Sequence, residues 1–109
     1  MSMWARLHNL MGGSGKTWNI AVTGLTNLNV PDPAAVVNLT GTATIATLTA
    51  DNAGRNRIVT FIQQDTGVTT FTSSTSLILG GDIALTNNKQ MTLYYQQDGT
   101  WVLMNSTAI

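Results

Sequence analysis

The heptapeptide RIVTFIQ at residues 57–63 is the strongest strand signal in the chain. It is a short run of β-branched and aromatic residues, and such side chains favour the pleated surface of a sheet. The run is bounded by DNAGRN at residues 51–56 and by the turn sequence Asp65-Thr66-Gly67. Its length and these flanking residues predict a strand rather than a buried helix.

Short apolar runs alternate with turn sequences on both sides of this strand. Asp98-Gly99 between two apolar runs predicts a β-hairpin, because both residues tolerate positive φ. Pro31-Asp32-Pro33 predicts a turn, because proline restricts its own backbone and that of the preceding residue. Further strands are expected at residues 19–22, 27–30, 36–39, 42–50, 68–72, 77–79, 83–85, 91–96 and 100–104.

This spacing predicts an all-β fold. Strands that recur about every 8–12 residues are typical of an antiparallel sandwich or a jelly-roll-like module, and an interlaced β-prism uses the same short strands. The sequence offers no helices to connect parallel strands, which argues against a parallel α/β sheet. The composition agrees, because the chain has 18 Thr but no Glu and only two Lys, so it lacks good helix formers.

Charge and cysteine content exclude several classes of protein. Without cysteine, the chain is neither a disulfide scaffold nor a holder of thiolate metal sites. Three Arg and two Lys scattered along the chain supply no basic face for nucleic acid, and no apolar run approaches the roughly 18 residues of a membrane span. Only 9% of the residues are charged, so strand edges lack the lysines that normally prevent pairing with other chains. We therefore expect an assembly of copies.

The N-terminal stretch differs from the rest of the chain. Trp4, Leu7, Leu10 and Met11 fall at helical spacing, and a glycine-rich hinge at residues 12–15 follows. We interpret residues 1–17 as an N-terminal arm and residues 18–109 as a single β domain. The four apolar residues are the candidates for anchoring this extended arm to a partner.

No motif predicts catalysis. GGSGKT at residues 12–17 resembles the end of a phosphate-binding loop, but Leu10 stands where that motif requires glycine and a strand rather than a helix follows. His8 has no second histidine, Cys or Glu nearby with which to build a metal site. The five Asp residues all stand in or beside turns, which local backbone hydrogen bonding explains. We expect no enzyme activity, no cofactor and no metal.

Aromatic residues are the candidates for subunit or ligand contacts. Trp18, Tyr94, Tyr95 and Trp101 could lie in a subunit interface or stack on a glycan. Tyr94 and Tyr95 are adjacent, so on a strand they point to opposite faces, and we expect one in the core and the other at a surface or subunit contact.

From about Asn38 onward, several motifs follow one another in a characteristic order. They are Ala53-Gly54-Arg55 before the apolar residues 58–62, then Thr70-Phe71-Thr72, LILGGD at residues 77–82, MTLYY at residues 91–95 and DGTWV at residues 98–102. This order resembles the small β-structured modules in tail fibres, tailspikes and head-decoration proteins of tailed bacteriophages. Residues 1–37 do not match the pattern, so the resemblance leaves the attachment point open.

The resemblance implies a homotrimeric, non-enzymatic structural protein of the virion, assembled in the host cytoplasm. Because the chain is short and has no long shaft, we expect a capsid decoration, cement or head-fibre protein whose arm docks on the major capsid protein or on a tail component. The alternative is a tail-fibre or tailspike module that binds host-surface polysaccharide, and a small depolymerase is a further rival. No nucleic-acid or membrane partner is expected.

Overall fold

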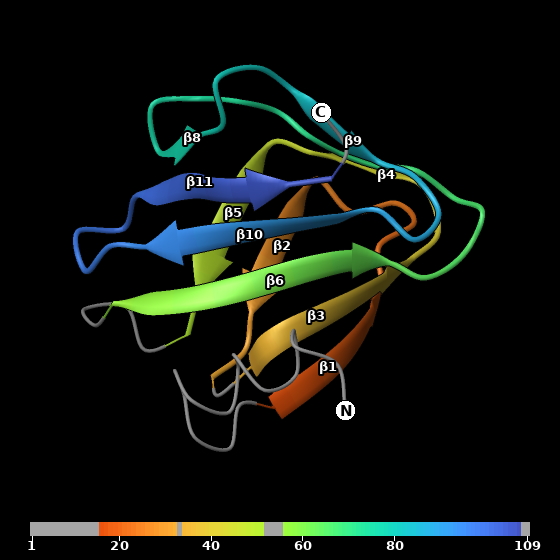
Figure 1. The fold of residues 1–109 in the computed structure, drawn as a ribbon, viewed down its shortest axis with the longest axis horizontal. Helices are drawn as coiled ribbons and strands as arrows, with labels where there is room; N and C mark the ends of the chain where they lie inside the picture. Colours follow the sequence, from red (N-terminus) through yellow and green to blue (C-terminus); the bar gives the residue numbers. More distant parts are fainter. Residues whose placement is uncertain (1–15, 33, 52–55, 108–109) are drawn as a thin grey trace.

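The computed structural model describes residues 16–32, 34–51 and 56–107 (Figure 1). All regular structure in these residues is β, which confirms the all-β class, and none of them lies in a helix. The strands are β1 (Lys16–Ala21), β2 (Asn27–Val30), β3 (Ala34–Thr40), β4 (Ala43–Ile45), β5 (Thr47–Ala50), β6 (Arg57–Gln63), β7 (Thr69–Phe71), β8 (Leu77–Ile78), β9 (Ile83–Leu85), β10 (Gln90–Tyr95) and β11 (Trp101–Ser106).

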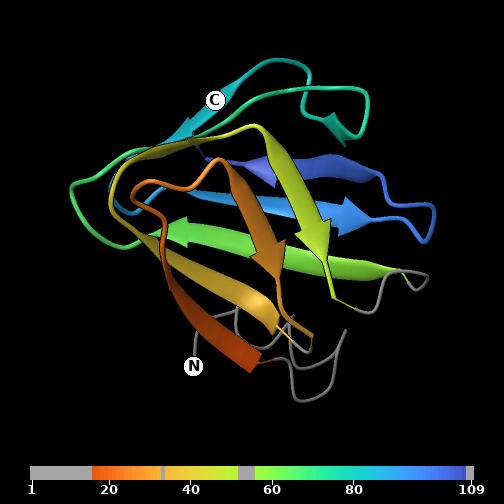
Figure 2. The same ribbon diagram turned by 180° about the vertical axis from the view of Figure 1, so that it is seen from behind.

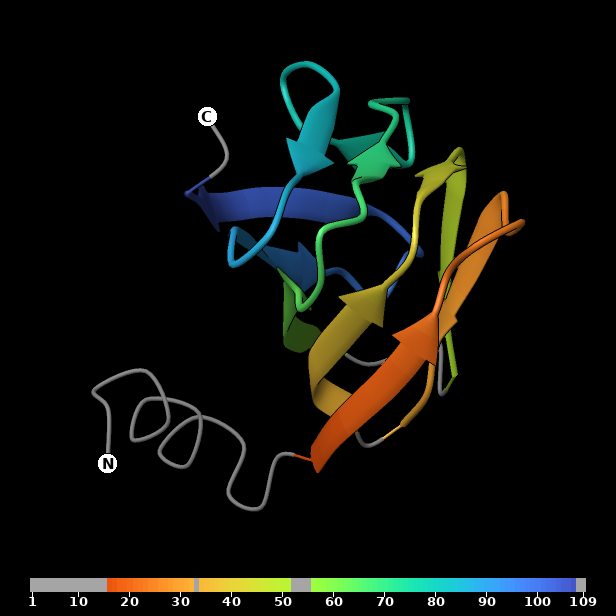
Figure 3. The same cartoon turned by 90° about the vertical axis from the view of Figure 1, so that its right-hand side faces the viewer.

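The strands form three sheets. The largest has the order β1-β3-β6-β10-β11-β8, in which β1, β3 and β6 are parallel and β10 is antiparallel to both β6 and β11. The second sheet is the parallel pair β2-β5, which lies behind the large sheet in Figure 1 and in front of it in Figure 2. The third has the order β4-β7-β9. Figure 3 shows β2 and β5 on the opposite side of the core from β10 and β11.

The N-terminal half stacks like the coils of a β-solenoid. The chain leaves β1, passes through β2 and returns as β3 beside β1, so that Asn19 lies next to Asn38. It then passes through β4 and β5 and returns as β6 beside β3, which places Val36 next to Thr60. After β7 and β8 the direction reverses, and β9, β10 and the β10–β11 hairpin complete the stack.

This arrangement corrects the expected antiparallel sandwich or jelly-roll-like fold. Most of the strand pairs are parallel, including every pair within the coils. The absence of helices does not exclude parallel pairing, because each crossover between parallel strands of the coils is made of strands that belong to another sheet. The turn residues and the alternation of side chains are the same in either arrangement, so they do not distinguish the two.

The predicted turns and strand positions agree with the structure better than the predicted pairing of the strands does. The hairpin at Asp98-Gly99 is confirmed, with Gly99 at φ +97° and its N–H donating to Gln96 O over 2.9 Å. The stretch 42–50 is divided into β4 and β5 at Ala46, because the N–H groups of Ala46 and Thr47 both turn toward Thr26 O. Lys16 and Thr17 of the expected arm belong to strand β1, and residues 1–15 of that arm lie outside the described residues.

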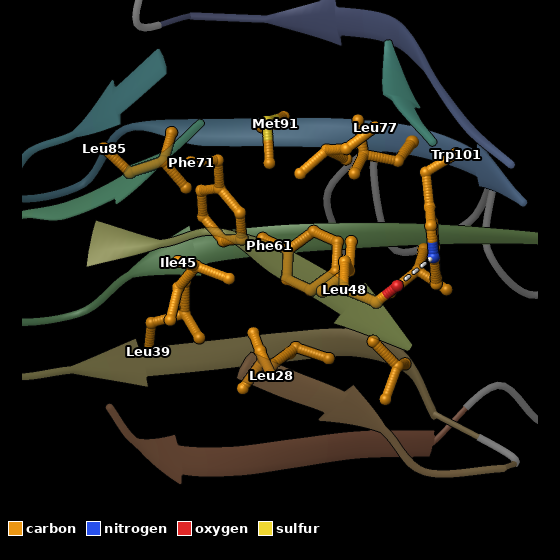
Figure 4. Packing of buried hydrophobic residues seen from close by; sticks show 14 of the residues in the cluster. Leu28, Leu39, Ile45, Leu48, Phe61, Phe71, Leu77, Leu85, Met91 and Trp101 are labelled. Atoms are coloured by element: carbon orange, nitrogen blue, oxygen red, sulfur yellow. Dashed lines mark hydrogen bonds between the residues drawn. The ribbon is translucent and has the colours of Figure 1, made fainter. Parts of the chain in front are cut away.

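The core fills the space enclosed by the three sheets. Phe61 packs against Phe71 and Trp101, with ring centroids 5.5 and 6.3 Å apart, and Trp101 also packs on Tyr95 at 4.6 Å. Trp101 is fully buried, and its Nε1 donates to Leu48 O over 3.1 Å (Figure 4). This hydrogen bond ties the large sheet to the β2–β5 pair across the core.

Candidate functional site

The described residues place several carboxylates in structural hydrogen bonds. They contain no group of three or more His or Asp side chains that could hold a metal ion. Asp98 accepts a hydrogen bond from the backbone N–H of Thr100 two residues on, as turn chemistry predicts, whereas Asp82 accepts from the backbone N–H of Ser73, nine residues earlier. Asp51 accepts instead from the side chain of Asn29 on the neighbouring coil. These carboxylates are engaged in holding turns and strands together.

Asp65 is the most strongly held carboxylate in the described part of the chain. Its Oδ2 accepts from Gly41 N, and its Oδ1 accepts from Gly67 N, each over 3.0 Å, and also from Gln63 Nε2 over 2.7 Å. The N–H of Gly41, followed by that of Gly67, holds the pKa of Asp65 below its ordinary value of 3.8. An ionised group committed to three donors is suited to fixing the corners after β3 and β6.

Four polar side chains are buried among the described residues, namely Arg57, Thr60, Gln63 and Thr69. Gln63 is fully buried, donates to Gly41 O over 3.0 Å and accepts from Thr69 Oγ1 over 2.7 Å. Arg57 is also buried, and its guanidinium donates to Pro31 O and Ala34 O at 2.8 and 2.7 Å. No buried side-chain N or O atom among the described residues lacks a partner, so these groups are structural and offer no free acid, base or nucleophile.

The outward-facing side of the large sheet carries the first candidate contact surface. Ile58 on β6 lies beside Tyr94 on β10, Tyr94 beside Val102 on β11, and Val102 beside Ile78 on β8. We call these four residues the apolar row. Each neighbours a buried, core-facing residue in its own strand, so the row faces outward. Ile78 is 46% exposed and the other three are half-buried.

The rest of this side of the sheet is neutral and polar. Thr60 Oγ1 and Thr92 Oγ1 are hydrogen-bonded across β6 and β10 at 2.9 Å. In the neighbouring strands β3, β6, β10, β11 and β8 of the large sheet, no outward position carries an Asp, Lys or Arg. Arg57 on β6 points into the core instead. Aliphatic and aromatic groups beside neutral hydroxyl and amide groups are typical of surfaces that pack against another protein without desolvating charge.

A ladder of side-chain amides crosses the parallel strands at the other end of the sheet. Gln64 Nε2 donates to Asn38 Oδ1 over 2.7 Å, and Asn38 Nδ2 donates to Asn19 Oδ1 over 3.1 Å. A second ladder joins the β2–β5 pair, where Thr47 and Thr49 donate to Asn27 and Asn29. Both ladders stabilise the parallel, in-register stacking of the coils.

The predicted aromatic candidates are divided between core and surface. Tyr95 and Trp101 are 3% and 0% exposed and belong to the core, so they are unsuited to a surface contact. Tyr94 is half-buried in the apolar row, which confirms that the two tyrosines point to opposite faces. Trp18 is 39% exposed on β1. The candidates therefore narrow to Tyr94 and Trp18.

The predicted anchoring residues lie outside the described part of the chain, and the structure adds surface residues that the sequence does not identify. Trp4, Leu7, Leu10, Met11 and His8 fall among residues 1–15. Lys16 and Thr17, at the end of the phosphate-loop-like stretch, start a strand, as expected for a sequence that is no such loop. The sequence patterns do not identify Ile58, Val102, Ile78 or Asn19 as candidates. Their alternation with apolar neighbours marks them as outward-facing, but only the register places them side by side.

No protein-family model matches this sequence, and the search of curated proteins finds no relative. The part of the chain that the structure describes contains no helix that could span a lipid bilayer.

Proposed function

We propose that this chain is a non-enzymatic structural protein of a tailed-bacteriophage particle, in which copies associate as homotrimers through the outward side of the large sheet. We favour a role as a capsid decoration, cement or head-fibre protein. The N-terminal residues would then bind the major capsid protein or a tail component. The order of motifs from Asn38 onward supports the assignment to phage particles.

The apolar row carries the proposed association. Ile58, Tyr94, Val102 and Ile78 form one continuous strip across four strands of the large sheet. Apolar surface removed from water contributes roughly 25 cal/mol per Å2, so a strip of this kind repeated at each contact gives several kcal/mol to the assembly. Tyr94 at its centre combines a large ring with a polar tip, the combination that interface cores favour.

A copy of the same chain fits this surface better than a glycan does. A sugar-binding platform needs polar groups around an aromatic ring to hold the hydroxyls in place. The direct cross-strand neighbours of Tyr94 are Ile58 and Val102, which offer only aliphatic surface. The geometry therefore supports protein contact at this ring.

A charge placed in the apolar row tests the association. Tyr94→Asp should weaken association through the apolar row by roughly 100-fold, as expected for a central interface residue, and remove the trimer from native mass spectra. Ala84→Asp is the matched control, because Ala84 is an exposed outward residue of the β4-β7-β9 sheet. Trimers that survive Tyr94→Asp, or a wild-type chain that is monomeric at micromolar concentration, would refute the proposed interface.

Two further measurements test the place of the chain in a particle. Antibodies against the folded chain should label the heads of intact phage particles, and labelling of tail tips would favour the tail-fibre alternative. A glycan array should show no specific binding. Specific binding that Tyr94→Ala abolishes would favour the polysaccharide-binding alternative instead.

A further inference from the structure

Strand β1 forms an exposed edge of the large sheet (Figures 1 and 3). Among the described residues it pairs only with β3, and five of its six residues are exposed. An edge of this kind presents a row of unpaired N–H and C=O groups that readily pair with another strand. Lys16 is the one charged residue of β1, and it stands at the very start of the strand.

The hydrogen bonding of Val22, the residue after β1, shows which backbone groups of β1 face its open side. Val22 N donates to Thr40 O on the β3 side over 2.9 Å. Because successive residues of a strand direct their backbone groups to opposite sides, Ile20 and Trp18 also face β3. The N–H and C=O groups of Thr17, Asn19 and Ala21 therefore face away from the sheet.

The amide ladder ends at the same place. It runs in one direction, from Gln64 to Asn38 to Asn19, with each side chain donating to the next. Asn19 accepts through Oδ1, and its Nδ2 has no partner within the part of the chain that the structure describes. The last member of the ladder thus offers a donor at the open edge.

The opposite side of β1 is apolar. Trp18 and Ile20 stand beside the core residues Val37 and Leu39 of β3, so their side chains lie on the core side of the sheet. Trp18 is nevertheless 39% exposed, because no described strand lies beyond β1. An indole placed at the open end of a core is suited to covering a partner's apolar side chain.

We infer that β1 pairs with β1 of a second copy, antiparallel and centred on Asn19. In this register Asn19 faces its own symmetry mate, and Thr17 faces the mate of Ala21. These are the three residues whose backbone groups point outward, so this register uses all of them, whereas a shift by two residues loses one facing pair. A two-fold axis through Asn19 makes the contact self-complementary.

Side chains match in this register on both sides of the sheet. On the outward side, the free amide of each Asn19 meets the carbonyl of the other, which joins the two ladders. On the core side, each Trp18 faces the mate of Ile20, an aromatic and β-branched pair of the kind that stabilises adjacent antiparallel strands. The two Lys16 side chains stand about 20 Å apart along the joined strands, so their repulsion is largely screened.

Single cysteines provide the test, because the chain has none of its own. The Cα atoms of facing, hydrogen-bonded residues are about 5.5 Å apart, within the roughly 4.4–6.8 Å that a disulfide spans. Asn19→Cys in the full chain should give a disulfide-linked dimer under mild oxidation. A mixture of Thr17→Cys and Ala21→Cys chains should give the mixed dimer.

Thr17→Cys alone is the matched control. It lies on the same exposed strand, but in the inferred register its symmetry mate is about 13 Å away, too far for a disulfide. We expect Asn19→Cys to cross-link at least about tenfold faster, because facing thiols have a high effective concentration. Equal rates for both variants, or no cross-link with Asn19→Cys, would overturn the inference.

Amide hydrogen exchange on the unmodified chain keeps the test decisive if a cysteine variant folds poorly. The N–H groups of Thr17, Asn19 and Ala21 should be protected in the associated state and exchange faster as the chain is diluted to monomer. Fast exchange at all concentrations would overturn the inference, and so would concentration-independent protection, which would mean that another part of the same chain covers the edge.

This contact is separate from the apolar row, so the two proposals fail independently. Each copy has one β1 edge, which joins copies in pairs, whereas the proposed trimer uses Tyr94 and its neighbours. Tyr94→Asp combined with Asn19→Cys should still give the cross-linked pair. If Tyr94→Asp abolished this cross-link as well as the trimer, the β1 edge would not be an independent contact.

Discussion

The carboxylate of Asp65 accepts a hydrogen bond from the backbone N–H of Gly41, which lies 24 residues earlier in the chain and one coil away. The same carboxylate holds Gly67 N and Gln63 Nε2. One ionised side chain thus binds the corner after β3 to the corner after β6, where the backbone N–H groups have no ladder partner. Several properties of the fold depend on this corner.

The stability of the fold should depend on the ionisation of Asp65. Because its pKa is lowered in the folded state, the carboxylate stabilises the fold above its unfolded value of 3.8, and this stabilisation disappears as the pH falls through the lower folded value. Asp65→Asn should therefore be less stable than the wild type at pH 7 in urea unfolding, with the difference narrowing as the pH falls below 3.8. A difference that stays constant with pH would show that the charge is irrelevant.

Gly67 should not tolerate a side chain. A Cβ at this position would meet the backbone carbonyl of Gly41, which cannot rotate away. Gly67→Ala should lower the free energy of unfolding by about 3 kcal/mol, at the upper end of overpacking effects. Gly99→Ala is the control, because a Cβ there meets nothing and only its positive φ opposes the change, at about 1–2 kcal/mol. A smaller loss for Gly67→Ala than for Gly99→Ala in thermal unfolding would contradict this packing.

Trp101 should stabilise the fold through its hydrogen bond as well as through the volume that its ring fills. Trp101→Phe leaves Leu48 O without its donor and creates a cavity beside Phe61 and Tyr95. We expect a loss of about 3 kcal/mol, because an orphaned buried carbonyl and the deleted ring atoms both destabilise the core. Denaturant unfolding with far-UV circular dichroism measures the loss, and a change below about 1 kcal/mol would show that the core repacks around phenylalanine.

Thr60 and Thr92 should behave as a coupled pair. Their hydroxyl groups are hydrogen-bonded on adjacent strands, and Thr60 is 1% exposed. Thr60→Val should lower stability by about 1 kcal/mol, because it removes the partner of the Thr92 hydroxyl, and Thr92→Val should cost less in a chain that already carries Thr60→Val. A double-mutant cycle in urea gives the coupling. Additive losses would indicate that the two side chains do not depend on each other.

The sequence predicts the strands well and their partners poorly. Residues 57–63 form β6 with the predicted bounds, and the hairpin at Asp98-Gly99 lies where the turn chemistry requires it. Both depend on nearest neighbours in the chain, which the sequence displays directly. The pairing of β1 with β3 and of β3 with β6 depends on which sheet each intervening strand joins, and strands with the same alternation fit several partners.

The candidate surfaces follow the same division. That Tyr94 and Tyr95 point to opposite faces follows from their adjacency, but only the packing of Tyr95 on Trp101 shows which of them enters the core. Ile58, Tyr94, Val102 and Ile78 come from four separate segments, and register alone places them in a row. The ladder from Gln64 through Asn38 to Asn19 likewise needs the parallel stack before three scattered amides become neighbours.

By itself, the sequence determined the β class, most strand positions and the near absence of charge, because these follow from side-chain shape, local turn chemistry and composition. Only the tertiary structure decided that the strands stack as parallel coils, that one tyrosine is buried and its neighbour is not, and that β1 pairs with a single strand among the described residues. The reason is physical: local preferences act between adjacent residues, whereas sheet partners are selected by how the whole chain encloses its apolar side chains.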